Sequence, residues 1–420
     1  MRKPVRIMAV GLVALMLLFS GSVFAKTVIT MQHMTTIPQT QKVLDEAIAK
    51  FQIANPDVEI SQTLVGWGDA HAQFTNSLIV GMAPDIVLLG GPWAPEFQRM
   101  GAFAPIDEYV SADVMDNFLA SAVGPVSADG HIYGLPWEGA TWGMFYRKDL
   151  FEAAGLDPNR PPQNWDELLE YALKLTTEEQ HGLVFPAGSW EATDYFMPFM
   201  WQAGNPVEQI VDGVWQGSFS DESGLAAAQF YVDLIHKHGV TPASIANMDW
   251  EDAKNAFVTG NAAMMFNGMW VINVIKESNP ELDGKWGTAM YPAGPGGRAS
   301  YGYPNYMHIP AQSKNKEVAG KFLEFLADSS EGISYAEKLA ISVSSLFWTK
   351  SFIELPYAQD ELIAPFAESL EIARFPSLAP AFEEFRELYL NPGIQGLILE
   401  TTTPEEFVKD MDDHFNQLNQ

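Results

Sequence analysis

The stretch from Gly139 to Trp165 constrains the fold more than any other part of the chain. Its first part, Thr141 to Tyr146, is a short apolar and aromatic run, which predicts a buried strand. A short helix should follow, because Asp149 can accept hydrogen bonds from the free N–H groups of a first turn and Glu152 stands three residues later. Gly155 should end this helix, since glycine takes the left-handed conformation of a helix end without a clash at Cβ.

A second helix belongs to the same stretch. After a proline-rich loop, Asn164 and Glu167 have the spacing of a helix cap and predict a helix over Trp165–Leu175. The order of strand, short helix, proline loop and second helix is typical of an α/β fold.

This order, its spacing and the Trp-Asp-Glu-Leu start of the second helix resemble the signature of the family 1 bacterial extracellular solute-binding proteins, which are the substrate receptors of ABC sugar importers. Arg147 departs from the family, which usually has Asn or Asp after the tyrosine. The resemblance is clearest over residues 85–103, 139–169 and 254–326. The alternative is a generic strand–helix–helix unit of another α/β protein.

The resemblance implies a two-lobed α/β fold. This is the type II periplasmic binding protein fold, similar to maltose-binding protein, in which each lobe is a mainly parallel sheet flanked by helices and a hinge joins the lobes. A chain of 420 residues also exceeds the size of one ordinary core. We expect an N-terminal lobe of residues 26–137 and 292–329, and a C-terminal lobe of residues 138–291 and 330–420.

Strand and helix patterns alternate in the first part of the chain. The expected strands are Val28–Gln32, Val58–Thr63 and Ile86–Leu89, and the expected helices are Gln39–Ala54 and His71–Val80. This order predicts a parallel sheet with right-handed crossovers. Ligands of such sheets bind beyond the carboxyl ends of the strands.

The N-terminal segment has the features of a secretory signal. Basic residues open it, and the apolar stretch Ile7–Phe19 is too short to cross a membrane comfortably. Small residues in Val23–Ala25 suit a cleavage site, so we expect residues 1–25 to be removed. The chain has no cysteine that could carry a lipid. We therefore expect a soluble periplasmic protein that is not a lipoprotein; an uncleaved membrane anchor is the alternative.

The charge of the chain argues against several classes of partner. Lysine and arginine number 24 and aspartate and glutamate 53, which gives a net charge of −29. Nucleic acids and anionic membrane surfaces need clusters of Lys and Arg, so we expect neither as a partner. The same charge favours a neutral ligand over a sugar phosphate. The absence of cysteine excludes disulfides, thiol catalysis and thiolate metal sites.

No motif indicates a metal or a cofactor. His236–His238 ends a predicted helix, where cations suit the helix dipole, and lacks further ligands. Gly294–Ala299 fits a loose dinucleotide pattern, but it precedes a strand and not a helix, so the geometry that cradles phosphate is missing. We expect neither a metal nor a cofactor.

Aromatic and polar residues recur together at predicted strand ends. A pyranose ring has apolar C–H faces, which a flat indole covers, and hydroxyl edges, which carboxylates and amides bind. The candidate ligand-binding residues share this character and are Gln32, His33, Trp67, Asp69, Trp93, Glu138, Trp190, Glu191, Asp194, Asn267, Trp270, Tyr303 and Asn305. The resemblance implies that Trp93, Glu138 and Trp270 lie in or at the sugar cleft. The alternative for a tryptophan is core packing, and for His33 a buried imidazole with satisfied hydrogen bonds.

Three functions fit these features. The first is a monomeric, non-enzymatic receptor that closes two lobes over a neutral oligosaccharide, monosaccharide or polyol and delivers it to an ABC permease. The second is a secreted glycoside hydrolase with Glu138 and either Glu191 or Asp194 as its acid pair. The third keeps the fold but binds a polyamine-type cation.

Overall fold

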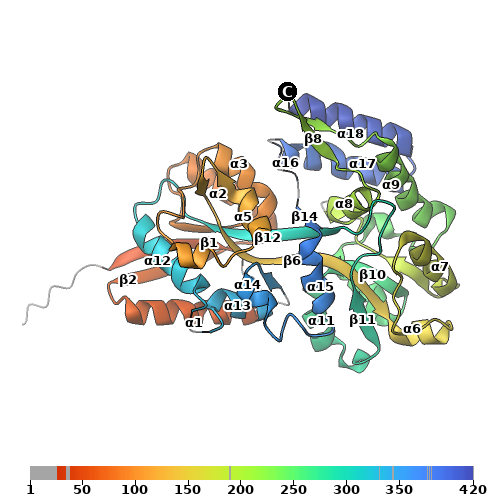
Figure 1. Ribbon diagram of the computed structural model, residues 1–420, viewed down its shortest axis with the longest axis horizontal. Coiled ribbons are helices and arrows are strands. Elements are labelled where there is room, and N and C mark those ends of the chain that lie inside the picture. The colour runs from red at the N-terminus through yellow and green to blue at the C-terminus, as the bar shows by residue number, and fades with distance from the viewer. Residues whose placement is uncertain are drawn as a thin grey trace, which may run out of the picture.

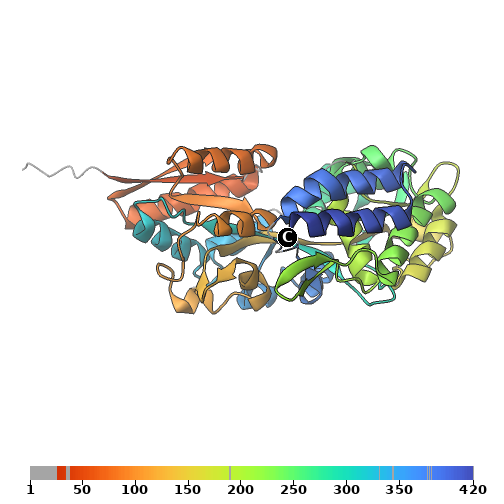
Figure 2. The ribbon, with the colours of Figure 1, turned by 90° about the horizontal axis from the view of Figure 1, so that it is seen from above.

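A computed structural model of the chain describes residues 26–34, 38–188, 191–330, 332–342, 345–375, 377, 379 and 381–419. The predicted signal segment, residues 1–25, lies outside these described residues. Two groups of elements lie side by side, and long strands pass between them (Figure 1). The view from above shows the same separation (Figure 2).

Three parallel strands form one end of the main sheet. β1 (Thr27–His33) pairs in parallel with both β2 (Val58–Leu64) and β3 (Ile86–Gly90). The helices α1 (Pro38–Ala54) and α2 (Trp67–Ile79) connect these strands, which confirms the predicted order. β3 is buried at every residue, as its continuous apolar sequence predicts.

Two long strands join the two groups of elements. β6 (Leu135–Arg147) and β12 (Ser300–His308) pair antiparallel with each other, and β12 also pairs antiparallel with β3. At its far end β6 pairs antiparallel with β10 (Ala262–Gly268) and β11 (Trp286–Ala289). With β7 (His181–Val184) parallel to β10, the sheet order is β2-β1-β3-β12-β6-β10-β7. We call residues 138–142 of β6 and 301–305 of β12 the strand crossing.

The signature stretch forms the predicted second helix. α7 (Trp165–Leu175) is capped by Asn164, whose Oδ1 accepts a hydrogen bond from the Glu167 N–H at 2.9 Å. Gly155 has a φ of 69°, which is the left-handed conformation expected after the short helix.

The predicted cap of the short helix is confirmed in part, because Asp149 Oδ1 accepts a hydrogen bond from the Leu150 N–H at 3.0 Å. Asp149 is, however, not the residue that precedes the helix. α6 (Lys148–Ala153) begins one residue before Asp149, so Asp149 lies in its first turn. Arg147 donates two hydrogen bonds to Asp149, from Nε at 2.8 Å and from Nη2 at 2.7 Å. A bidentate pair with a guanidinium is stronger than a single cap hydrogen bond, and it holds the carboxylate toward Arg147.

The second group of elements is mainly helical around its strands. Its helices are α8 (Ala192–Gln202), α9 (Glu222–Val232), α10 (Trp250–Thr259) and α11 (Val271–Ser278), with short turns η4 (Asp233–Lys237), η5 (Ile245–Asn247) and η6 (Pro280–Leu282). The helix that begins at Glu222 is α-helical to Val232 and continues as the π-helical turn η4. The hairpin of β8 (Glu208–Val211) and β9 (Val214–Gly217) extends from this group.

Short elements connect β3 to β6. They are η1 (Gly91–Trp93), α3 (Ala94–Arg99), α4 (Ala112–Met115), α5 (Ala120–Val123), η2 (Gly124–Val126), β4 (Ser127–Ala128) and β5 (His131–Ile132). The β4–β5 hairpin turns at Asp129 and Gly130, which both have positive φ.

The C-terminal part divides between the two groups. Its elements are α12 (Lys316–Ala327), α13 (Tyr335–Ser342), β13 (Leu346–Phe347), α14 (Lys350–Ile353), α15 (Ala364–Glu368), η7 (Ser369–Glu371), β14 (Ala373–Arg374), α16 (Phe382–Phe385), η8 (Arg386–Leu390), α17 (Asn391–Ile398) and α18 (Pro404–Leu418). α17 packs on α8, and α18 packs on α9 and β9.

Two elements of this part lie where we did not expect them. One is α14, where Lys350 Nζ donates to the Asp116 carbonyl at 2.7 Å and Asn117 Nδ2 donates to Ser351 Oγ at 2.9 Å, and the other is α13. We assigned residues 330–420 to the C-terminal lobe, but α13 packs against α1 and α12, which belong to the expected N-terminal lobe (Figure 1). The reason is its apolar face, which buries Ala336, Leu339 and Ala340. The other lobe boundaries stay a prediction.

The main hydrophobic core extends through the strand crossing. The largest hydrophobic cluster runs through both groups and contains Ile29 of β1, Trp137 of β6 and Met264 of β10. A smaller cluster with Phe74 and Phe97 supports α2 and α3. Within the described part of the chain, no helix combines the length and the apolar character needed to cross a bilayer.

Candidate functional site

Two polar residues meet at the centre of the strand crossing. Asn305 of β12 donates a hydrogen bond from Nδ2 to Glu138 Oε1 of β6, at 2.9 Å. Asn305 is only 4% exposed, and its Oδ1 has no hydrogen-bond partner among the described residues. Burial raises the pKa of Glu138, and hydrogen bonds from Asn305 and Ser345 oppose that rise. The pair therefore offers a carboxyl group and an unused amide oxygen at the boundary between the two groups of elements.

Tyr303 connects this pair to both sides of the crossing. Its hydroxyl lies over Gly90 at the end of β3, where a Cβ would approach the hydroxyl oxygen to 2.5 Å. Only glycine at position 90 permits that contact. Burial raises the pKa of Tyr303, and the charges that act on it include those of Arg386 and Glu138. Tyr303 thus lies between the end of β3, the Glu138 pair and the C-terminal helices.

Aromatic rings form a rim on the β3 side. Trp67 begins α2 and Trp93 ends η1, and their ring centroids lie 6.3 Å apart. His71 of α2 contacts Trp93 edge-on at 5.6 Å, and its Nε2 lies 3.0 Å from Glu96 Oε2. Trp67 is 37% exposed. The rim therefore presents indole surface together with a polar His–Glu pair.

The other candidates on this side differ in burial. Asp69 lies in the first turn of α2 and is exposed. Gln32, at the end of β1, is buried, and its Nε2 has no hydrogen-bond partner among the described residues. His33 is fully buried, and this burial lowers its pKa. His33 is therefore a neutral imidazole inside the protein, which is the alternative that the sequence left open.

Three tryptophans meet on the β10 side. Trp142 of β6 and Trp270 after β10 contact each other edge-on, with centroids 5.1 Å apart and planes at 81°. Trp250, the first residue of α10, lies 6.5 Å from Trp270. A Cβ at Gly268 would lie 1.7 Å from the Trp270 ring, so only glycine lets this indole fold over the end of β10. The β10 side thus carries an aromatic surface like that of the rim.

Asn267 has a positioning role in this surface. Its Oδ1 accepts hydrogen bonds from the Tyr195 hydroxyl at 3.1 Å and from the Gly268 N–H at 2.9 Å. Its Nδ2 donates to the Trp250 carbonyl at 3.1 Å. The amide is fully buried and its hydrogen bonds are made inside the protein. Asn267 holds Trp250 and the end of β10 in place.

Carboxyl groups gather next to the aromatic surface. Asp194 Oδ1 of α8 lies 3.8 Å from Arg386 Nη2, and Glu383 Oε2 lies 3.3 Å from Arg386 Nη1. Glu191 accepts a hydrogen bond at Oε2 from the Trp250 N–H at 3.0 Å. Burial and the nearby charge of Asp194 raise the pKa of Glu191 to about 8. Burial also raises the pKa of Asp194, against the attraction of Arg386.

The two sides of the crossing are electrostatically linked. Burial raises the pKa of Glu383, and Arg386 and, more weakly, His71 oppose this rise. Glu383 belongs to α16 in the C-terminal part of the chain, whereas His71 belongs to α2 on the opposite side of the strand crossing. We call Glu191, Asp194 and Glu383 with Arg386 the carboxyl cluster. The rim and the carboxyl cluster therefore face a common region.

The structure brings several of the candidate residues together. It also adds residues that the sequence did not single out. Trp67 meets Trp93, Glu138 meets Asn305, and Glu191, which precedes α8, interacts electrostatically with Asp194 in its first turn. Trp190 lies outside the described residues. The sequence did not single out His71, Glu96, Glu383 or Arg386, and no local motif marks them. Among the described residues, no three His, Cys, Asp or Glu side chains gather in a way that could hold a metal ion.

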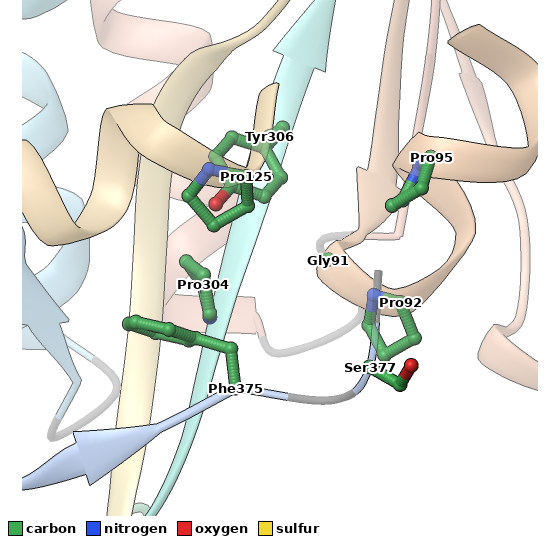
Figure 3. Close-up of a pocket in the computed structure, with 8 residues that line it drawn as sticks. All are labelled: Gly91, Pro92, Pro95, Pro125, Pro304, Tyr306, Phe375 and Ser377. Carbon is green, nitrogen blue, oxygen red and sulfur yellow. The ribbon is translucent and has the colours of Figure 1, made fainter. Parts of the chain in front are cut away.

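A small pocket opens beside the crossing (Figure 3). Its lining comes from the loop after β3, from β12 and from the segment after β14, and comprises Gly91, Pro92, Pro95, Pro125, Pro304, Tyr306, Phe375 and Ser377. None of the thirteen candidate residues lines it, although Trp93 and Tyr303 are chain neighbours of residues that do. Apolar rings and proline faces dominate the pocket, so it extends the apolar part of the region.

Comparison with known proteins gives a consistent picture. The model of the family described as "Bacterial extracellular solute-binding protein" matches residues 36–332. A putative binding protein of Brucella abortus is 30% identical over 376 residues, which covers 89% of this chain and 88% of that protein. A maltotriose-binding protein of Pyrococcus abyssi is 23% identical over 306 residues, covering 70% of this chain and 62% of that protein.

Solved structures extend this similarity to the fold. Maltose-bound MalE3 of T. maritima is 25% identical to this chain, with a TM-score of 0.79. The match covers 93% of this chain and 99% of that one. The structural neighbours are two-lobed sugar-binding proteins, so the two groups of elements are the two lobes of that fold.

Proposed function

The chain belongs to the bacterial extracellular solute-binding protein family, and from this premise we propose that it binds a neutral carbohydrate and delivers it to an ABC permease. The ligand is an oligosaccharide, a monosaccharide or a polyol. The members of the family are substrate-binding proteins and not enzymes, and we extend this to the present chain. It acts as a periplasmic monomer without a lipid anchor, after residues 1–25 are removed.

One observation carries this proposal: indole surfaces flank a polar pair at the strand crossing. Trp67 and Trp93 lie on one side, Trp270 lies on the other with the buried Trp142 packed edge-on against it, and the Glu138–Asn305 pair belongs to the strand crossing that joins the two sides. Flat apolar surfaces suit the C–H faces of a sugar ring, and the carboxyl and amide groups suit its hydroxyls. The similarity to maltose- and maltotriose-binding proteins supports the same ligand class.

Capture proceeds by hinge closure. β6 and β12 join the lobes, so rotation at the strand crossing brings the two aromatic surfaces toward each other. A sugar that touches both surfaces only in the closed state favours that state by the free energy of those extra contacts. We propose that the lobes comprise residues 26–137 and 292–329 against 138–291 and 330–420, with α13 and α14 transferred to the first.

The charge of the region supports a neutral ligand. Glu138, Glu191, Asp194 and Glu383 surround the crossing, and Arg386 is already paired with two of these carboxyl groups. A phosphate group would meet this excess of carboxylate, which disfavours it electrostatically. The same groups therefore disfavour a sugar phosphate relative to a neutral sugar.

The test is a titration of maltose, maltotriose, lactose, sorbitol and spermidine into the purified protein by calorimetry, with chromatography of the sugars afterwards. We expect one-to-one binding of a carbohydrate and no products. Products would support the hydrolase with Glu138 and Glu191 or Asp194. Binding of spermidine alone would support the polyamine alternative.

Replacing Trp270 with alanine tests the site itself. We expect Trp270→Ala to weaken sugar binding by about 1–3 kcal/mol, roughly 5- to 150-fold, because it removes one aromatic surface. Trp215→Ala is the matched control, since Trp215 is a half-buried indole in the β8–β9 hairpin, away from the crossing. Equal affinities of the two variants, with unchanged thermal unfolding, would remove Trp270 from the site.

A further inference from the structure

The charges of the carboxyl cluster do not balance. The cluster contains the carboxyl groups of Glu191, Asp194 and Glu383 and one guanidinium, that of Arg386. Glu191 is 5% exposed, and Asp194 and Arg386 are 4% exposed each. A single cation does not compensate two buried carboxylates and a third that is partly buried, and an uncompensated buried charge is strongly disfavoured. At least one carboxyl group in the cluster therefore holds a proton.

Glu191 is the member with the least compensation. Its one hydrogen bond comes from the Trp250 N–H to Oε2, and within the described part of the chain no group donates to Oε1. Three charged groups face it: Asp194 from α8 and Asp249 from the start of α10 repel its charge, and only Arg386 from η8 attracts it. Burial and Asp194 raise the pKa of Glu191 to about 8, so the side chain is a neutral acid at pH 7.

A second buried group adjoins the cluster. Tyr301 is fully buried, and its hydroxyl interacts with Asp194, which opposes the rise that burial causes in the pKa of that carboxyl group. Among the described residues, Asp194 thus has both Tyr301 and Arg386 beside it, whereas Glu191 accepts its hydrogen bond from the Trp250 N–H. The Tyr301 ring contacts Trp142 edge-on at 5.0 Å, and Trp250 lies 6.5 Å from Trp270, so the cluster adjoins the aromatic surface.

We propose that Glu191 determines specificity as a neutral acid, donating its proton in a hydrogen bond to an oxygen of the bound carbohydrate. This inference rests on the proposed function. An ionised Glu191 has no hydrogen to donate and adds a negative charge next to the ligand. A ligand with an ammonium group has the opposite requirement, because it binds better to the ionised form.

The sign of the pH dependence follows from this role. Binding needs the protonated acid, whose fraction in the free protein falls once the pH exceeds about 8. Affinity for maltose, or for the panel sugar that binds if maltose does not, should be constant from pH 6 to 7.5. Above pH 8 it should fall by up to about tenfold per pH unit. Calorimetry from pH 6 to 10, with thermal unfolding at each pH, measures this.

Variants separate the proposed role from a structural one. Glu191→Gln keeps an amide donor and an oxygen for the Trp250 N–H, so its affinity at pH 7 should stay within about threefold of wild type and lose its pH dependence. Glu191→Ala should bind at least about tenfold more weakly at every pH. Glu170→Gln, on the exposed face of α7, is the matched control and should keep the wild-type profile.

Each contrary result has a distinct meaning. A flat wild-type profile, an affinity that rises with pH, or a Glu191→Gln variant as weak as Glu191→Ala would overturn the role of Glu191 and leave carbohydrate binding intact. Failure of every panel sugar to bind at any pH would overturn the proposed function and this inference together.

Discussion

His308 of β12 is buried in a setting that admits only its neutral form. Its ring stacks on Phe103 with centroids 3.9 Å apart, and its Nδ1–H donates to the Tyr133 carbonyl at 2.7 Å. Nε2 has no hydrogen-bond partner among the described residues. Burial lowers the pKa of His308 to about 4. The imidazole thus packs β12 against the smaller aromatic cluster, which contains Phe103. A protonated imidazole would destabilise this packing.

This residue should make the fold sensitive to mild acid. In the unfolded chain a histidine takes up a proton near pH 6.5, whereas folded His308 does so only near pH 4. Its contribution to the free energy of unfolding is therefore complete above pH 6.5 and is lost as the pH falls from 6.5 to 4. The loss should reach about 3 kcal/mol. Urea unfolding at pH 7, 5.5 and 4.5 measures it.

Two variants test the assignment. His308→Gln retains a donor but does not titrate, so its stability should fall less than that of the wild type over this pH range. His238→Gln, at the end of η4, should follow the wild-type curve. If His308→Gln and the wild type lose stability in parallel, another group causes the acid sensitivity.

At the scale of single residues, the sequence indicated some of the side chains around the strand crossing and missed others. Trp93, Glu138 and Trp270 came from a family resemblance, and the structure puts all three near the strand crossing. Arg386 could not be predicted, because its partner Asp194 is far away in the chain and only the fold brings them together. Asn267 fitted the expected chemistry, but its hydrogen bonds are made within the protein.

Among the helices, α7 offers the clearest test of a local signal. The Asn164 side chain accepts the Glu167 N–H, which is otherwise unpaired in the first turn. Asn164→Ala should lower the free energy of unfolding by about 1 kcal/mol, because it leaves that N–H without its protein acceptor. Asn159→Ala, an exposed asparagine in the preceding loop, is the control and should change stability by less than about 0.5 kcal/mol. Urea unfolding compares the two, and equal losses would contradict the cap.

Elements were predictable where local pattern determined them. The bounds of α7 match the prediction, because the Asn164 cap and the apolar spacing are both local features of this helix. Asp149 accepts the Leu150 N–H as predicted, but its pair with Arg147, which also donates to the Phe257 carbonyl at the end of α10, could not be read from the local pattern. The apolar face of α13 predicts a buried helix, but it does not predict which surface covers that face. The packing of α13 on α1 therefore could not be predicted without the structure.

For the whole molecule, the connections between lobes decide how it can move. β6 and β12 run through both lobes, and β13 and β14 add short pairings to them at the crossing. The resemblance predicted two lobes and a hinge, which agrees with the fold of the structural neighbours. The contacts between the lobes could not be predicted, because they depend on the relative orientation of parts that are distant in sequence. Motion at the crossing is therefore the property to measure.

Closure on a ligand should make the molecule more compact. Two lobes joined by a few strands have a larger radius of gyration than a compact chain of this length, for which about 21 Å is expected. A panel sugar that binds should move the measured value toward this number, because it contacts both aromatic surfaces only when the lobes approach. X-ray scattering with and without saturating sugar measures the change. Trp270→Ala at the same sugar concentration should show a smaller decrease, in proportion to its lower occupancy, and should match the wild type once it is saturated. A saturated wild-type protein with an unchanged radius of gyration would show that binding occurs without closure.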